Sequence, residues 1–147
     1  MIVSASVIIN ADVNKVWETF TDLTCWKSWN TVITDVSDET PNALAEGGQF
    51  NFCIRPFTVP FRLEAKVEEV VRARKIVWSA RKFGVFARHE FLFEDLADGT
   101  RVTSIETFAG FRLALACFRL GKNRLGSLTS QMLDELKKVS ENSTRSR

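Results

Sequence analysis

The only histidine of the sequence, His89, lies in ARHEFLFED, a stretch in which large apolar residues alternate with charged ones. Glu106 lies in the next alternating stretch along the chain, GTRVTSIETF. An imidazole beside a carboxylate can act as a general acid and base, can bind a hydroxyl or carbonyl group of a ligand, or can form a structural hydrogen bond. The residue types leave these three roles open.

The two stretches are joined by ADGT, whose Asp-Gly pair is a strong signal for a tight hairpin. With an even-numbered loop centred on that pair, one face carries three opposed pairs: Phe91 with Glu106, His89 with Phe108, and Phe93 with Ser104. His89 and Glu106 are then diagonal neighbours, about 7 Å apart at the backbone. Because an unpaired carboxylate on an apolar face is costly, we expect Glu106 to be paired or partly neutral.

Two more hairpins extend this face across the sheet. Even turns at Phe83–Gly84 and Phe57–Thr58 place Trp78 beside His89 and align the apolar residues of FNFCI with those of FRLEA. The many rings on this face either fill the core or enclose a ligand. We predict that a ligand cavity is lined by Trp29, Phe50, Phe52, Phe61, Leu63, Trp78, His89, Phe91, Glu106, Phe108, Leu128 and Met132.

The sequence shows no nucleophile paired with a base. Cys53 falls on the opposite face of its strand, and no serine motif of the hydrolase type occurs. If the protein is an enzyme, we therefore expect it to act through His89 and Glu106 as acid and base.

The hairpins belong to a chain whose patterns predict an α+β fold. The start, IVSASVIINA, alternates as a strand, and DVNKVWETFTDL has helical spacing with Asp12 as its N-cap. The short helical piece TCWKSWN follows, and from about residue 32 the period becomes two through about six antiparallel strands. The amphipathic stretch NRLGSLTSQMLDELKKVSE predicts a long helix that covers the dry face of the sheet. We expect one domain over residues 1–140 and a disordered polar tail over 141–147.

Composition argues against several functional classes. The net charge of +2 is too small to indicate nucleic-acid binding. One histidine and three cysteines without a CxxC spacing argue against a transition-metal site and fit a reduced, cytoplasmic protein. The N-terminus has no signal-peptide pattern, and the longest apolar run, FRLALACFRL, is too short to span a membrane. We expect no metal and no organic cofactor.

Several motifs occur in a fixed order along nearly the whole chain. The stretch VWETFTDLTCWKSWN contains Val16, Trp17, Asp22, Trp26, Trp29 and Asn30. EGGQF, GTRVTSIETFAG and LDELKK follow it. This ordered set resembles the SRPBCC (START-like) superfamily, and within it the polyketide cyclase/dehydrase-like branch. The resemblance implies a helix-grip fold, in which an antiparallel sheet of six or seven strands curves around a long C-terminal helix. Two short helices follow the first strand, and a deep cavity separates sheet and helix.

The resemblance also implies a function. Its cavity would bind a hydrophobic or amphipathic small molecule of the lipid, isoprenoid, quinone or aromatic polyketide class, as a carrier or a sensor. A first alternative is a cyclase, aromatase or dehydratase that uses His89 and Glu106. A second alternative is a protein-interaction module whose cavity is filled.

The stretch GFRLALACFRLGKNRLG connects the last strand to the long helix. Leu113, Cys117 and Leu120 have helical spacing in it, so it is either an early part of that helix, kinked near Gly121, or a mobile entrance to the cavity. In the second case, transient contact with a membrane surface would involve Arg112, Arg119, Lys122 and Arg124.

Overall fold

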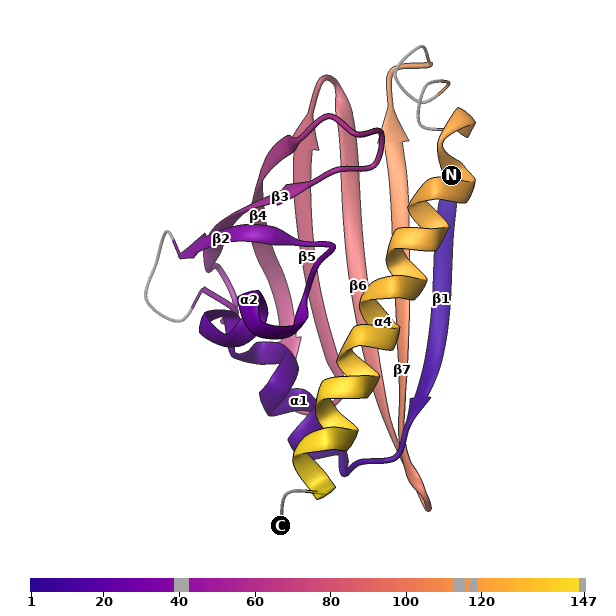
Figure 1. Cartoon of the computed structure of the whole chain (residues 1–147). Helices are drawn as coiled ribbons and strands as arrows, with labels where there is room; N and C mark the ends of the chain where they lie inside the picture. Colours follow the sequence, from indigo (N-terminus) through magenta and orange to yellow (C-terminus); the bar gives the residue numbers. More distant parts are fainter. Residues whose placement is uncertain (39–42, 113–115, 117–118, 146–147) are drawn as a thin grey trace.

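A computed structural model of the chain describes residues 1–38, 43–112, 116 and 119–145 (Figure 1). Its seven strands form one antiparallel sheet in the order β1-β7-β6-β5-β4-β3-β2. The strands are β1 Ile2–Ile9, β2 Thr34–Asp38, β3 Gln49–Ile54, β4 Phe61–Val71, β5 Lys75–Lys82, β6 Val85–Leu96 and β7 Gly99–Gly110. The helices are α1 Val13–Thr21, the 3-10 helix η1 Leu23–Cys25, α2 Trp26–Trp29 and α4 Lys122–Arg145. The sheet curves around α4, which confirms the predicted helix-grip architecture.

Local signals set the two short helices. The Asp12 side chain caps α1 by accepting a 2.9 Å hydrogen bond from the backbone N–H of Asn14, as predicted. Trp26, at the start of α2, is fully buried and donates from Nε1 to the carbonyl oxygen of Phe20 at 2.7 Å. Its ring lies 6.2 Å from that of Trp78 on β5. Trp26 therefore anchors the short helices on the sheet.

The hairpin between β5 and β6 has the predicted register. Lys82 pairs with Val85, and the two turn residues, Phe83 and Gly84, both have positive φ angles, of 52° and 76°. This conformation is typical of a type I′ turn, whose twist matches that of the strands. The even loop places Trp78 directly opposite His89, as expected.

The β6–β7 hairpin keeps the predicted faces but shifts the predicted pairs. Its two-residue loop is Ala97–Asp98, one residue earlier than the Asp-Gly centre that the sequence suggested. Gly99 instead begins β7 with a φ of 149°, against the carbonyl group of Ile9, where a Cβ atom would clash. The shift moves the pairing register by two residues, so His89 lies directly opposite Glu106 rather than diagonal to it.

The turn between β4 and β5 contains an odd number of residues, which by itself would reverse the faces of the next strand. Val71 pairs with Lys75 across a three-residue loop. A register shift between Val67 and Glu69 inserts one extra residue into β4 and compensates for the odd loop. Val67 consequently pairs with Trp78, and the apolar face stays continuous.

The long helix extends further than predicted. α4 continues to Arg145, whereas the sequence indicated a disordered tail from residue 141. Glu141 accounts for part of the extension, because it pairs with Lys137 at 2.6 Å and accepts a 2.9 Å hydrogen bond from the backbone N–H of Asn10. Leu113 and Cys117, on which the interpretation of the preceding stretch depended, lie outside the described residues. No described helix is both long and apolar enough to span a bilayer.

Candidate ligand cavity

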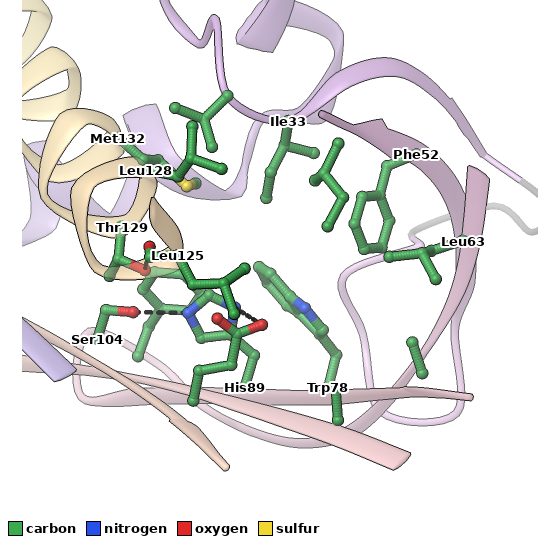
Figure 2. Close-up of a pocket in the computed structure, with 16 residues that line it drawn as sticks. Ile33, Phe52, Leu63, Trp78, His89, Ser104, Leu125, Leu128, Thr129 and Met132 are labelled. Carbon is green, nitrogen blue, oxygen red and sulfur yellow. Dashed lines mark hydrogen bonds and ion pairs between the residues drawn. The ribbon is translucent and has the colours of Figure 1, made fainter. Parts of the chain in front are cut away.

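A cavity of about 70 Å³ lies between the sheet and α4 (Figure 2). It is lined by Val32, Ile33, Phe52, Ile54, Leu63, Trp78, Ala80, Ala87, His89, Phe91, Ser104, Glu106, Leu125, Leu128, Thr129 and Met132. A second cavity of about 50 Å³ adjoins it, and Leu63, Glu106 and Leu125 line both. An apolar cavity of about 150 Å³ is known to bind benzene. Each space is smaller than that, so even a single-ring ligand requires side chains to move apart.

Small residues on two neighbouring strands create the space. Ala80 of β5 pairs with Ala87 of β6, next to the much larger pair of Trp78 and His89. Both alanines line both cavities. Because protein interiors are otherwise close-packed, two alanines side by side on a face of rings leave a void.

The opposite wall comes from α4 and from the bend that precedes β2. Leu125, Leu128, Thr129 and Met132 recur at intervals of three and four residues, which places them on one side of the helix. The bend forms because Asn30 Oδ1 accepts hydrogen bonds from the backbone N–H groups of Val32 and Ile33, at 3.0 and 2.9 Å. Figure 2 shows Ile33 facing the space from this side.

Three polar side chains gather on the sheet wall. His89 Nε2 lies 2.6 Å from Ser104 Oγ, and His89 Nδ1 lies 3.9 Å from Glu106 Oε1 (Figure 2). Ser104 is fully buried, and the His89 and Glu106 side chains are only 12% and 18% exposed. The imidazole also stacks on Phe91, with ring centroids 4.1 Å apart. The histidine is therefore held on both sides, by a hydrogen bond and by a ring.

Burial makes the neutral forms of both titratable groups more stable. It lowers the pKa of His89 to about 3 and raises the pKa of Glu106 to about 7. Near neutral pH the imidazole is uncharged, so one ring nitrogen donates and the other accepts. The 3.9 Å contact is then not an ion pair, and the Glu106 carboxyl changes its protonation state close to pH 7.

The structure brings most of the predicted cavity residues together. Eight of them line the larger cavity: Phe52, Leu63, Trp78, His89, Phe91, Glu106, Leu128 and Met132. Phe61 and Phe108 line the second cavity. Trp29 and Phe50 line neither, because both are packed against other rings of the core.

Sequence reasoning missed other lining residues, of which Ser104 matters most. The predicted register puts Ser104 on the correct face but opposite Phe93, too far along the strand to reach His89, whereas the structure pairs it with Phe91. The helical spacing around Leu128 and Met132 could have indicated Leu125 and Thr129. Within the described parts of the chain, no three histidine, cysteine, aspartate or glutamate side chains are grouped as metal ligands would be.

The curved sheet, the long helix and the cavity between them define a helix-grip fold. Solved structures of other proteins share this fold. A hypothetical protein of Helicobacter pylori is 24% identical, with a TM-score of 0.80 over 95% of this chain and 88% of that one. The Zhui aromatase/cyclase of a Streptomyces species is 12% identical, with a TM-score of 0.79 over 98% and 95%. A START superfamily protein of Mycobacterium smegmatis is 13% identical, with a TM-score of 0.76 over 96% and 97%.

The sequence itself identifies the family. Residues 1–141 match the model of the family described as polyketide cyclase / dehydrase and lipid transport, and the chain belongs to that family. No curated protein matches the chain. Family and fold together support a role in hydrophobic ligand binding or in cyclisation.

Proposed function

We propose that the protein binds a compact hydrophobic or amphipathic molecule in the cavity between the sheet and α4. The observation that carries this proposal is the composition of the wall. Apart from Thr129 on α4, whose hydroxyl donates to the Leu125 carbonyl, the polar side chains gather at one place, His89, Ser104 and Glu106. An apolar enclosure with a few convergent polar groups is the usual form of a small-molecule site.

The volume of the cavity bears on the size of the ligand. Lipids, isoprenoids, quinones and aromatic polyketides all exceed about 70 Å³, so they would require the α4 wall to move. Met132 favours such movement, because its unbranched side chain adapts readily to a new shape. Single-ring molecules require the least rearrangement.

A larger side chain in the cavity should strongly reduce ligand binding. We expect Ala87→Leu to occupy the space between Trp78 and α4, and to reduce ligand occupancy at least tenfold while the fold is retained. Native mass spectrometry of freshly purified protein, with denatured extracts analysed beside it, measures occupancy and identifies the chemical class of the ligand. Ala109→Leu, the same change at an exposed position of β7, is the matched control and should leave occupancy unchanged.

Two results would contradict the binding proposal. One is a wild-type chain that carries no adduct and binds nothing across a set of small apolar compounds, which would favour an interaction module. The other is equal occupancy in wild type and Ala87→Leu, which would place the ligand elsewhere.

A catalytic role is the second candidate, favoured by the contact between Ser104 and His89. A hydroxyl 2.6 Å from an imidazole, with a carboxyl on the far side of the ring, has the order of groups found in nucleophilic catalysis. Ser104, however, lies in the middle of β7, and the strands on both sides of β7 pair with it. This placement favours acid–base chemistry by His89 and Glu106 over attack by the serine. A bound compound recovered from wild type in altered form, but unaltered from His89→Gln, would support catalysis.

One end of the molecule has the composition of a membrane-contacting surface. Residues 55–62, 81–86 and 110–124 contain eight lysines and arginines and no acidic residue. Exposed apolar side chains occur in the same segments: Phe57, Val59, Phe83, Phe111 and Leu120. The Phe57 ring packs against Gly121 and the Phe111 ring against Gly84, so described residues of all three segments are neighbours in space. Two carboxylates, Asp35 and Glu64, line a surface pocket together with Arg62 and Arg81.

This basic and apolar end is proposed to touch anionic membranes, because each lysine or arginine near such a surface contributes about 1 kcal/mol. Reversing two charges with Arg112→Glu and Lys122→Glu should weaken binding to vesicles of phosphatidylglycerol and phosphatidylcholine more than tenfold. Lys27→Glu with Lys138→Glu makes the same change in net charge at exposed positions elsewhere and should have little effect. Co-sedimentation at low and high salt measures the binding. Equal binding to pure phosphatidylcholine, or none to either vesicle, would rule out this contact.

A further inference from the structure

The larger cavity contains an acidic group and no basic one. None of the 16 residues that line it is a lysine or an arginine, and its only other titratable group is His89. Lys82 lines the adjoining second cavity, where its ammonium group donates to the Arg62 carbonyl and lies 5.4 Å from the centre of the Phe83 ring. Glu106 is therefore the only lining side chain of the larger cavity that can carry a charge near neutral pH.

The Glu106 carboxyl is also available to a ligand. Its contact with His89 Nδ1, at 3.9 Å, is too long for a hydrogen bond. The other ring nitrogen of His89 already contacts Ser104 at 2.6 Å. Within the described part of the chain, the two carboxyl oxygens thus border the cavity without a hydrogen-bond donor, although a buried carboxylate normally has one.

We propose that the cavity selects ligands that present an ammonium group or a hydroxyl or N–H donor to Glu106, and that it rejects carboxylates of the same shape. The reason is electrostatic: an anionic ligand would bring a second negative charge beside Glu106 in a site without a cation. A donor or a cation instead supplies the missing partner, and the rings of Trp78 and Phe91 provide π faces beside it. This inference rests on the proposed binding function and narrows it to a ligand class.

A dependence on pH follows from the groups that surround Glu106. β6 contributes His89, whose pKa is lowered by burial so that it stays neutral, and α4 contributes only Leu125, Leu128, Thr129 and Met132. The second cavity adds Lys82. Because burial raises the pKa of Glu106 to about 7, an ammonium ligand must displace a proton below that pH. Binding of an amine should therefore strengthen as the pH rises through 7.

Four single-ring compounds of nearly equal shape test the selectivity: benzylamine, p-cresol, toluene and benzoate, titrated into the full-length protein and followed by the NMR signals of cavity residues. At pH 8 we expect benzylamine and p-cresol to bind at least tenfold more tightly than benzoate. Benzylamine affinity should fall several-fold at pH 6, and toluene affinity should not change. Glu106→Gln should remove the advantage of benzylamine over toluene, whereas Glu64→Gln, on the outer face, should change nothing.

The outcomes separate this inference from the function on which it rests. If benzoate binds as tightly as benzylamine, the selectivity is wrong and the binding function stands. If none of the four compounds binds, both are wrong for ligands of this size. If Glu106→Gln keeps the full preference for benzylamine, a group other than Glu106 selects the ligand, and the inference fails.

Discussion

Replacing Glu106 by glutamine should make the protein lose stability as the pH is lowered from 6.5 to 4.5, by about 1.4 kcal/mol per pH unit. Replacing His89 by glutamine should produce the opposite slope, with stability lost as the pH rises from 4.5 towards 7. In the wild-type protein the two contributions should cancel, so His89 and Glu106 together should add no pH dependence to the stability over this range. The difference between the free energies of unfolding of the two variants should therefore change by about 5 kcal/mol over two pH units.

The signs follow from which state binds the proton. The folded pKa of His89, about 3, is below its ordinary value of 6.5, so between these values the unfolded chain holds the extra proton and acid destabilises the fold. The folded pKa of Glu106, about 7, is above its ordinary 4.5, so between these values the folded state holds the extra proton and rising pH destabilises it. From 4.5 to 6.5 the two effects cancel, and each substitution removes one of them.

Urea unfolding at half-unit pH steps would measure these slopes, and the remaining groups contribute equally to all three proteins. Glutamine suits both positions, because it matches the shape of glutamate and its amide can reach Ser104 from position 89. Parallel curves for the two variants would show that at least one of the groups is not buried as described.

Replacing Phe20 by alanine should lower the free energy of unfolding by about 3–5 kcal/mol. Phe20 is fully buried, and its ring contacts four others, those of Trp26, Trp78, Phe91 and Phe93, at centroid distances of 5.6, 6.1, 4.7 and 5.4 Å. Trp78 and Phe91 line the ligand cavity with their other sides. Ligand affinity should therefore fall as well, although Phe20 itself does not line the cavity.

The matched control is Phe83→Ala, which removes the same ring from a position that is 73% exposed. It should cost less than about 1 kcal/mol. Urea unfolding at constant pH measures the free energy of unfolding of both variants. The comparison holds if the slope of this free energy against urea concentration is the same in both. A loss below about 1 kcal/mol for Phe20→Ala would mean that the rings of the core do not form the interlocked cluster described above.

The faces of the sheet could be predicted from sequence because strand periodicity and hairpin loop parity determine them. Trp78, His89 and Glu106 were placed on one face correctly for that reason. Parity does not determine the exact pairs. When the β6–β7 loop begins one residue earlier, every side chain stays on its predicted face, but each residue of β6 pairs with a residue of β7 two positions away from the predicted one. The contact between Ser104 and His89 was missed for this reason.

The sequence also could not show which residues of the apolar face lie in the packed core and which border the cavity. Phe50 and Phe52 share a face of β3, but Phe50 packs against Trp26 and Trp78, and Phe52 borders the cavity. The even turn at Phe83–Gly84 that sets Trp78 opposite His89 also pairs Ala80 with Ala87. Its consequence, a void, depends on how α4 lies across the sheet, and no local pattern gives that position.

The contacts between α4 and β1 also bear on the colloidal behaviour of the protein. An open sheet exposes the backbone of its edge strands to other copies, and here the edges are β1 and β2. β2 is short and interrupted by a bulge, which makes it a poor template. β1 is longer and carries exposed Ile2 and Ile8, and Lys137 on α4 occupies one acceptor of this strand by donating to the Ile8 carbonyl oxygen at 2.7 Å. An opening of α4 that carries Lys137 away would free this acceptor, so we expect self-association in concentrated solution to become faster the more often the helix lifts.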